Sequence, residues 1–422
     1  MSELCATGDI DQSVPESQRR AISEHEKGWR RIVRNFTPAW FSVNMGTGIV
    51  SILLFNMPYN GAWLYWLSVI VFAWNVFLFC LFLFISILRY SLYPDIWLAM
   101  IRHPAASMFL GTFPMGLATI VEMVALVCVP AWGPRAATLA WALWWIDSAI
   151  SVVICYCLPF IMLQTLNKLI LIPLRSMYVH DTKLSTVTAV WLLPIAASIV
   201  ASATGGVVAE VLPDPRHALW TVIVSYILWG TAIPLSMSCL VIYLQRLMLH
   251  NLPPREAIMS VFLPIAPLGQ GAFAIMQLGK VALDIFPKTD TLDSQSTNSG
   301  AVLYVMGWLV GIIMWSFGVA WIFFALASIS RSRFPFNMSW WGFTFPLGVF
   351  TGATTALGKE IPSRFFSVLS TILSVIVILL WLMVSIQTTR KAISREIFVA
   401  PYVKAVLPHK SSAETKNGSD AA

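Results

Sequence analysis

Pro114-Met-Gly116 is the first of four short segments in which a proline and a nearby small residue interrupt or head a long apolar stretch. The others are Pro194-Ile-Ala196, Pro267-Leu-Gly269 and Pro346-Leu-Gly348, and Pro38 heads an earlier stretch. These prolines recur about every 73 to 80 residues. Inside a lipid-embedded helix, a proline frees a backbone carbonyl, which only protein or water can satisfy. The interval therefore predicts five copies of one helical hairpin around a single pore.

The composition places this 422-residue chain in a bilayer. Apolar residues make up 58% of it and charged residues 11%, whereas about a quarter of a soluble domain is charged. Between Arg34 and Arg89 there is no Asp, Glu, Lys or Arg, which leaves room for two spans of about 20 residues each. The first 29 residues are polar, so we expect no cleavable signal peptide and a first span that acts as its own signal.

The sequence predicts an all-α membrane protein with one transporter domain over residues 31–395. Polar tails at 1–30 and 396–422 are expected to be cytoplasmic, and the N-terminal one disordered. One set of loops is rich in Lys and Arg, while acids dilute the cations of the other set, so both termini are predicted to be cytoplasmic. Ten spans are expected, near residues 37–57, 62–88, 104–129, 136–163, 184–211, 217–247, 257–283, 299–329, 339–358 and 364–388.

The odd-numbered spans differ from the even-numbered ones in side-chain size. Gly46-Thr-Gly48 and Gly269-Gln-Gly271 are typical of the odd spans, and Val69–Leu88 is typical of the even ones. Small residues let backbones approach one another or a lumen, and bulky ones face lipid. The odd spans are therefore predicted to form an inner ring of five parallel helices whose positive N-terminal ends gather at the cytoplasmic mouth. That geometry favours the entry of an anion from the cytosol.

Hydroxyl and amide side chains of the odd spans are candidates for the anion path. Lys280 and Lys359 lie near the outer ends, and no Lys or Arg lies deep in an odd span, which favours a small anion held weakly. Each candidate could instead be a polar residue that only packs helices together. The candidates are Asn44, Thr47, Thr112, Ser198, Thr204, Gln270 and Thr344.

Three phenylalanines beside the prolines are candidates for a gate. Phe113 precedes Pro114, Phe345 precedes Pro346, and Phe343 lies two residues earlier. A ring on a lumen face can close a narrow pore, although ordinary packing is the alternative for each ring. The predicted pore and gate residues are Phe345, Phe343, Phe113, Pro114, Pro194, Pro267 and Pro346.

Glu122 is an acid in the middle of an odd span. An ionisable side chain inside a membrane is functional by default, and the alternatives here are proton coupling and a structural hydrogen bond. No Ser/His/Asp arrangement is readable, and the six cysteines show no metal-ligand spacing. We therefore expect no catalytic residue, metal, cofactor or nucleic-acid partner. The contrasting class is a membrane receptor or a lipid-modifying enzyme. A receptor would be expected to present a substantial extracellular ligand surface, but the outer loops are short.

Four segments resemble motifs of the tellurite-resistance/dicarboxylate transporter family, which includes the guard-cell anion channels. They are Phe36-Thr-Pro-Ala-Trp-Phe-Ser-Val-Asn-Met-Gly-Thr-Gly48, Gly111-Thr-Phe-Pro-Met-Gly116, Ala266-Pro-Leu-Gly-Gln-Gly271 and Trp341-Gly-Phe-Thr-Phe-Pro-Leu-Gly348. Within this family the sequence is most similar to the fungal sulfite efflux pumps, over about residues 30–395. The resemblance implies ten helices, a five-helix pore in each protomer of a homotrimer, and a gate at Phe345, with Phe343 as the alternative.

The resemblance also implies a function. Sulfite efflux pumps export sulfite across the plasma membrane for detoxification, and in keratin-degrading fungi the exported sulfite cleaves cystine bonds of substrate proteins. The alternatives within the same family are a malate or other C4-dicarboxylate permease and a small-anion channel. A dicarboxylate spreads two charges over a longer body, so we would expect a basic residue in its pore.

Overall fold

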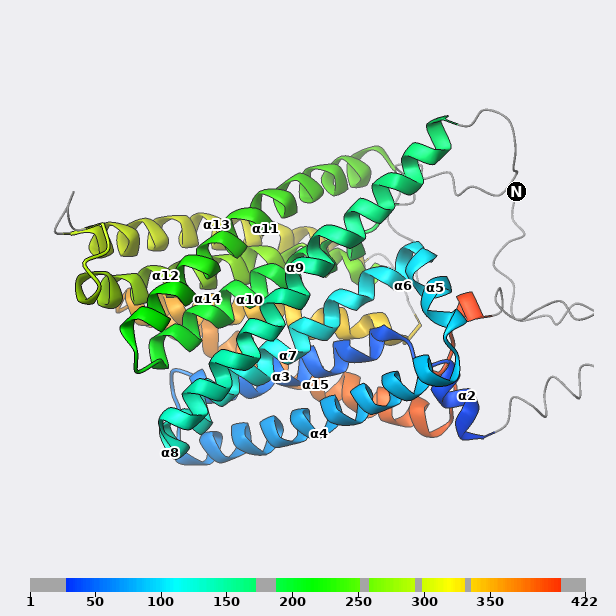
Figure 1. Ribbon diagram of the computed structural model, residues 1–422, viewed down its shortest axis with the longest axis horizontal. Coiled ribbons are helices and arrows are strands. Elements are labelled where there is room, and N and C mark those ends of the chain that lie inside the picture. Colours follow the sequence, from blue (N-terminus) through cyan, green and yellow to red (C-terminus); the bar gives the residue numbers. More distant parts are fainter. Residues whose placement is uncertain (1–27, 172–186, 251–257, 293–297, 331–334, 404–422) are drawn as a thin grey trace, which may run out of the picture.

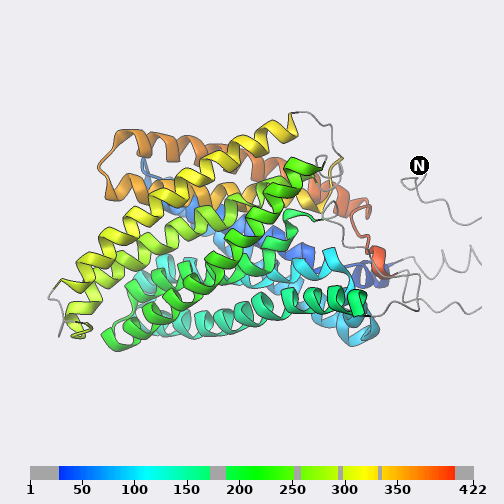
Figure 2. The same cartoon turned by 90° about the horizontal axis from the view of Figure 1, so that it is seen from above.

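The computed structural model describes residues 28–171, 187–250, 258–292, 298–330 and 335–403. Within these ranges all regular structure is helical, and the helices lie side by side in an elongated bundle (Figures 1 and 2). The long helices are α3 (Phe41–Asn56), α4 (Ala62–Leu92), α7 (Thr112–Met123), α9 (Pro134–Leu171), α10 (Leu192–Val211), α11 (Pro215–Leu249), α12 (Ile265–Lys288), α13 (Ser299–Ile329), α14 (Trp341–Glu360) and α15 (Arg364–Ile393).

In the described ranges, nine helical segments are long and apolar enough to cross a membrane. The predicted span near 104–129 is a composite of α6 (Pro104–Met108), a 3₁₀ turn, α7, a π-helical turn (Val124–Cys128) and α8 (Val129–Trp132). The predicted span near 339–358 corresponds to α14, which is rich in Gly and Thr, ends in Lys359-Glu360 and is not among the nine. The nine segments establish a multi-pass membrane protein.

The helices fall into a buried set and an exposed set that alternate along the chain. The most apolar windows of the spans built on α3, α7, α10 and α12 are 78 to 100% buried, whereas those of α4, α9, α11, α13 and α15 are 22 to 33% buried. Most residues of α14 are buried as well. We call α3, α7, α10, α12 and α14 the inner helices and the other five the outer helices.

The inner helices contact one another in a closed cyclic order. α3 packs against α7, α7 against α10, α10 against α12, α12 against α14, and α14 returns to α3. Each outer helix packs on the outside of this ring: α4 on α3, α9 and α11 on α10, α13 on α12, and α15 on α14. Bulky apolar side chains of the outer helices remain exposed, as expected for surfaces that face lipid.

A glycine lies at each of the five contacts of this ring, and at all but Gly206 an added Cβ would come closer than 3.0 Å to the residue that it faces. At Gly269 of α12, an added Cβ would lie 2.7 Å from the backbone N and Cα of Phe350 of α14. At Gly111, before α7, it would lie 2.5 Å from the backbone oxygen of Leu193 of α10. The set, with the residue that each Cβ would meet, is Gly48 (Thr119), Gly111 (Leu193), Gly206 (Gln277), Gly269 (Phe350) and Gly348 (Ile49).

The prolines lie at or near the beginnings of the inner helices rather than at mid-helix kinks. A 3₁₀ turn precedes every inner helix, and Pro38 is the first residue of the turn before α3. Pro114, Pro194 and Pro267 are each the third residue of their helix. A proline costs little at Pro194 and Pro267 because the first N–H groups of a helix have no intrahelical partner, while Pro114 follows the 3₁₀ turn inside the composite span. Pro346 is the sixth residue of α14. Among the prolines of the four repeated segments, it is the one that removes a hydrogen bond from the interior of its helix.

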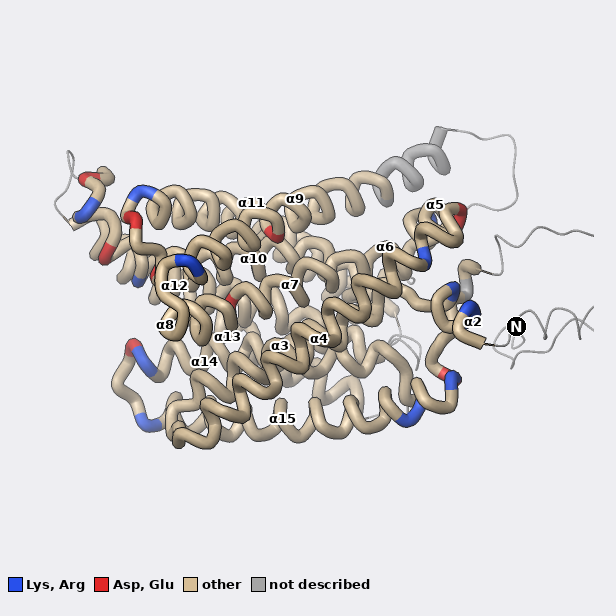
Figure 3. The backbone as a smooth tube through the Cα atoms, turned by 60° about the horizontal axis from the view of Figure 1, so that its bottom comes forward, with Lys and Arg blue, Asp and Glu red and all other residues tan. Residues whose placement is uncertain are grey.

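The two ends of the bundle differ. The α2 end holds α2 (Trp29–Arg34), α5 (Asp95–Arg102) and the last turns of α15, and the α8 end holds α8 and the turn after α12 (Figure 1). The first described helix and the last turns of α15 thus share one end, as the sequence predicts for the two termini. Helix α5 lies where the sequence predicted a loop. Charged residues concentrate at the two ends (Figure 3).

The last described residues pack onto the α2 end through a buried arginine of α4. Arg89 donates hydrogen bonds to the backbone oxygen of Arg34 at 3.0 Å, to the hydroxyl of Tyr90 at 3.0 Å and to the hydroxyl of Tyr402 at 2.9 Å. Tyr402 and Val403 are buried against α5 residues in a small apolar cluster. Burial raises the pKa of the Tyr402 hydroxyl, which therefore stays protonated near neutral pH.

The close contact at Gly269 predicts a loss of stability on substitution. Gly269→Ala places a methyl group 2.7 Å from the Phe350 backbone, so α12 and α14 must separate. We expect a cost of about 1–3 kcal/mol and a lower thermal unfolding midpoint in detergent. Gly230→Ala on α11 is the control, because its Cβ meets nothing within 4 Å and alanine favours the helix. Equal midpoints for the two variants would contradict the close packing of the ring.

Candidate functional site

A cavity of about 540 Å³ opens at the α2 end, where the inner helices begin. Each of the five 3₁₀ turns that precede an inner helix contributes to its wall, through Ala39, Phe109, Val190, Met259 and Met338. The wall of this cavity thus contains a residue of the turn before each inner helix. Because a helix beginning carries a partial positive charge, this cavity, called the larger cavity below, favours negative solutes.

Side chains add polar groups to the wall of the larger cavity. His103 accepts a hydrogen bond from the backbone N–H of Ala106 at 3.2 Å and so caps α6. Lys391 of α15 donates to the backbone oxygen of Phe336 at 3.1 Å, and its positive charge lies at the cavity wall. Thr112, Ser42 and Ser260 also line this cavity.

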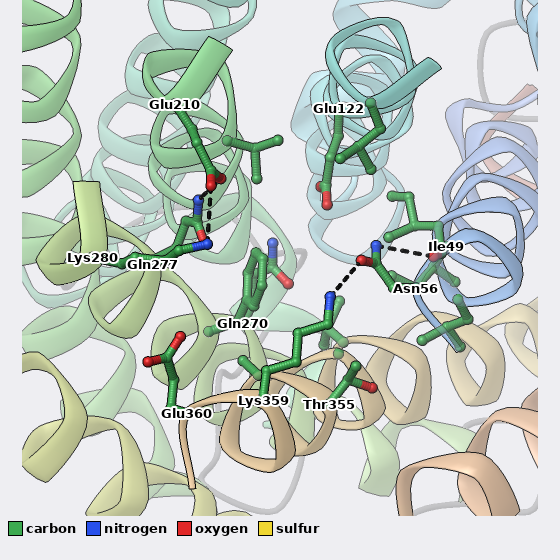
Figure 4. Close-up of a pocket in the computed structure, with 18 residues that line it drawn as sticks. Ile49, Asn56, Glu122, Glu210, Gln270, Gln277, Lys280, Thr355, Lys359 and Glu360 are labelled. Carbon is green, nitrogen blue, oxygen red and sulfur yellow. Dashed lines mark hydrogen bonds and ion pairs between the residues drawn. The ribbon is translucent and has the colours of Figure 1, made fainter. Parts of the chain in front are cut away.

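A second cavity, of about 250 Å³, lies at the α8 end and is lined by the inner helices and by the π-helical turn that continues α7 (Figure 4). Its deeper wall includes the largely buried side chains of Glu122 and Gln270. Closer to the mouth, it is lined by Asn56, Thr355 and the end of α14. The two cavities therefore lie at opposite ends of the same ring of inner helices.

Charged and amide side chains in the smaller cavity form two separate groups (Figure 4). In the first, Glu210 of α10 receives Lys280 at 2.9 Å on one carboxylate oxygen and the amide of Gln277 at 2.6 Å on the other. In the second, Lys359 of α14 donates to the side-chain oxygen of Asn56 of α3 at 3.0 Å. Each group joins two different inner helices.

An apolar layer separates the two cavities. Phe345 of α14 lies one helical turn from Gly342, which lines the larger cavity, and one turn from Val349, which lines the smaller one. Ala266 of α12 holds the same position between residues that line one cavity and the other. Phe345, Ala266 and Met115 of α7 are almost fully buried and belong to one hydrophobic cluster. The side chains between the cavities are therefore apolar and tightly packed.

The predicted gate phenylalanines have different surroundings. Phe113 points toward α3 and α4, with its ring 5.0 Å from that of Phe41 and 5.4 Å from that of Phe79. Phe343 packs against Phe262, with ring centres 4.6 Å apart. Phe345 lies on the face of α14 that carries the cavity-lining residues. Pro114, Pro194, Pro267 and Pro346 are buried near the beginnings of their helices.

Two of the predicted anion-path residues line a cavity: Thr112 the larger one and Gln270 the smaller one. Others bond to neighbouring helices. Asn44 donates to the side-chain oxygen of Asn75 of α4 at 3.1 Å, and Thr47 accepts from the indole N–H of Trp381 of α15 at 3.1 Å. The remaining three residues, Ser198, Thr204 and Thr344, are buried and do not line either cavity.

Lys280 and Lys359 are the site residues that the sequence-based prediction did not include. Lys359 is the second-last residue of α14, and Lys280 lies about two turns before the end of α12. Charges are common near helix ends, so such a position does not by itself predict a role in the path. A signal was available in the helical register, because Gln270, Gln277 and Lys280 follow one face of α12. The structure brings that face and Lys359 into one cavity.

Comparison with known proteins agrees with this architecture. Residues 35–389 match the family model of the SLAC1 voltage-dependent anion channels. The chain is 52% identical over 366 residues to the sulfite efflux pump SSU1 of Arthroderma benhamiae, covering 87% of this chain and 93% of that protein. Identity to the SSU1 pump of Arthroderma otae is 51%, covering 88% of this chain and 96% of that protein.

The more distant relatives include one protein named for a different cargo and a further sulfite efflux pump. The malic acid transport protein of Schizosaccharomyces pombe is 23% identical over 357 residues, covering 83% of this chain and 77% of that protein. The SSU1 pump of Candida albicans is 27% identical over 368 residues, covering 82% of this chain and 72% of that protein. The family match covers most of the chain, including every inner helix, so the chain belongs to the SLAC1 voltage-dependent anion channel family.

Proposed function

We propose that this protein exports sulfite or bisulfite from the cytosol, along the axis of the ring formed by the inner helices. The observation that carries the proposal is a closed ring of five helices with a cavity at each end, in a chain more than half identical to proteins named sulfite efflux pumps. In this pathway the anion enters the larger cavity, crosses the apolar layer at Phe345 and leaves through the smaller cavity. The gradients across the membrane set the direction of flow.

The malate alternative has weaker support. The relative named for malic acid shares 23% of its aligned residues with this chain, against 52% for the nearer sulfite pumps. A malate dianion would gain most from two cations at a fixed spacing. In the smaller cavity Lys280 is already neutralised by Glu210, which leaves Lys359 for the cargo. A small anion of low charge suits that arrangement better.

The proposal includes an orientation, a membrane and an assembly. The described ends of α2 and α15 lie at one end of the bundle, and Arg30, Arg34, Arg390 and Lys391 lie there too. Such an excess of cations favours the cytoplasmic side. The plasma membrane and the homotrimer are parts of the proposal that follow from the similarity to sulfite efflux pumps. The proposed ten-span arrangement counts α14 as a span together with the nine apolar segments.

Cargo identity is tested by flux into and out of liposomes that contain the purified protein. We expect sulfite to cross at a rate at least about tenfold that of malate at equal concentration, because the smaller cavity offers charge for one anionic group. Protein-free liposomes and liposomes with an unrelated membrane protein are the controls. Malate flux that equals or exceeds sulfite flux would reject the sulfite assignment.

The gate proposal is tested at Phe345. Phe345→Ala removes the ring between the two cavities, so we expect a severalfold higher sulfite flux than in the unchanged protein. Phe343→Ala is the matched variant, because this ring packs on Phe262 and its loss should lower stability rather than open the path. Thermal unfolding in detergent checks that both variants fold. Unchanged flux through folded Phe345→Ala protein would assign the gate elsewhere.

Proton coupling is tested at Glu122, which is largely buried and lines the smaller cavity. A carboxyl group that gains and loses a proton during transport makes flux depend on pH, and a glutamine cannot titrate. We expect Glu122→Gln to flatten the pH profile of sulfite flux. Asp284→Asn, in an exposed ion pair on α12, is the control. A profile that matches that of the unchanged protein would leave Glu122 with a structural role.

A further inference from the structure

Lys280 and Lys359 both line the smaller cavity, but the groups that accept their hydrogen bonds differ in charge. The ammonium of Lys280 contacts one oxygen of the Glu210 carboxylate at 2.9 Å, while the amide of Gln277 donates to the other oxygen at 2.6 Å. Lys280 and Gln277 lie one helical turn apart on α12. Together they hold the carboxylate of Glu210 as they would hold an external oxyanion, so this position is already filled by the protein itself.

Lys359 has a neutral partner. Its ammonium donates to the side-chain amide oxygen of Asn56 at 3.0 Å, which fixes its position without cancelling its charge. Figure 4 shows the Lys359 side chain extending from α14 across the cavity toward Asn56 on α3. The adjacent Glu360 extends in another direction and accepts a hydrogen bond from the hydroxyl of Tyr304. The charge of Lys359 is therefore directed into the cavity space.

From this asymmetry we infer that Lys359 is the anion-binding residue of the smaller cavity, with Gln270 as a neutral donor deeper in the same cavity. The ligand is a small oxyanion with one charged group, and this inference rests on the proposed function. Glu210 neutralises Lys280, so Lys359 is the cation of the cavity wall that does not bond to a carboxylate. Glu122 contributes an acid to the deep wall and Glu360 to the mouth, and both limit the affinity further.

Weak binding has a role in transport. An anion that has passed the apolar layer must be attracted into the smaller cavity and must then leave it, so a site that binds too tightly slows release. One available ammonium supplies the attraction, because a charge-assisted hydrogen bond is about twice as strong as a neutral one. The Glu210–Lys280 pair prevents a second cation from joining it. Glu210 thereby sets how tightly the anion is held, although it would repel the anion directly.

Charge-neutralising substitutions test the inference, because they should move the KM for sulfite in opposite directions. In liposomes with the full-length protein, we expect Lys359→Gln to raise the KM for sulfite at least about tenfold. Glu210→Gln releases Lys280 and should lower the KM about threefold or more, with a slower maximal rate. Lys359→Arg keeps the charge and should stay within about twofold of the unchanged protein.

Lys288→Gln is the matched control. Lys288 pairs with Asp284 at 2.6 Å on the same end of α12 but does not line the cavity, so its loss changes the local charge without touching the site. A purely structural role for these residues would lower the transport rate and stability of all variants in the same direction. If Lys359→Gln has the KM of Lys288→Gln, or if Glu210→Gln raises the KM, the inference is rejected while sulfite transport stands. If the unchanged protein carries no sulfite, the proposed function and the inference both fail.

Discussion

Close approach of helix backbones is the constraint on which the rest of the structure depends. In a bilayer the lipid tails are as apolar as the side chains, so helices associate through close packing more than through the hydrophobic effect. Here a glycine stands at every contact of the inner ring, and at Gly111 and Gly269 the neighbour is backbone. A larger residue at Gly111 or Gly269 would meet the backbone of the neighbouring helix and push two inner helices apart. The dimensions of the ring and the stability of the fold therefore share one cause.

The same packing determines where polar groups can lie. Between the cavities lie Phe345, Met115 and other buried apolar residues that belong to one hydrophobic cluster. Toward each end the helices leave a cavity lined in part by polar and charged side chains, whereas Ser198, Thr204 and Thr344 are buried outside both cavities. At one end the 3₁₀ turns present the beginnings of five helices, and at the other Lys280 and Lys359 supply positive charge. Positive groups thus lie on both sides of an apolar layer, accompanied in the smaller cavity by the acids Glu122, Glu210 and Glu360.

Much of the fold could be predicted from the sequence, because the signals are strong in a bilayer. The uncharged run between Arg34 and Arg89 fixes two spans, and small residues such as Gly46 and Gly48 mark a buried helix. The prolines were harder to interpret, since a proline in an apolar stretch looks the same whether it kinks a helix or lies in its first turn. Helix α5 was missed because it is only eight residues long, too short to span a membrane, and lies beside Pro94 between two predicted spans.

The candidate site could be predicted only in part. Residue type suggested Asn44 and Thr47 as well as Gln270, but the direction of each side chain depends on the rotation of its helix. Asn44 and Thr47 turned out to bond to Asn75 and Trp381 of outer helices, whereas Gln270 lines a cavity. Lys359 is absent from the predicted anion path because it lies near a helix end. Its partner Asn56 is 303 residues away in the sequence, a distance over which no local pattern can report contact.

The buried Arg89 has a consequence for how the protein is made. One of its hydrogen-bond partners, Arg34, precedes it in the chain, but Tyr402 follows it by 313 residues. A ribosome completes Tyr402 only after every long helix has been synthesised, so the guanidinium must wait for that hydroxyl throughout membrane insertion. Until then, water or lipid headgroups have to solvate the arginine at the surface of the bilayer. The hydrogen bond between Arg89 and Tyr402 at the α2 end therefore forms late in biogenesis. Chains truncated before Tyr402 would lack this hydrogen bond.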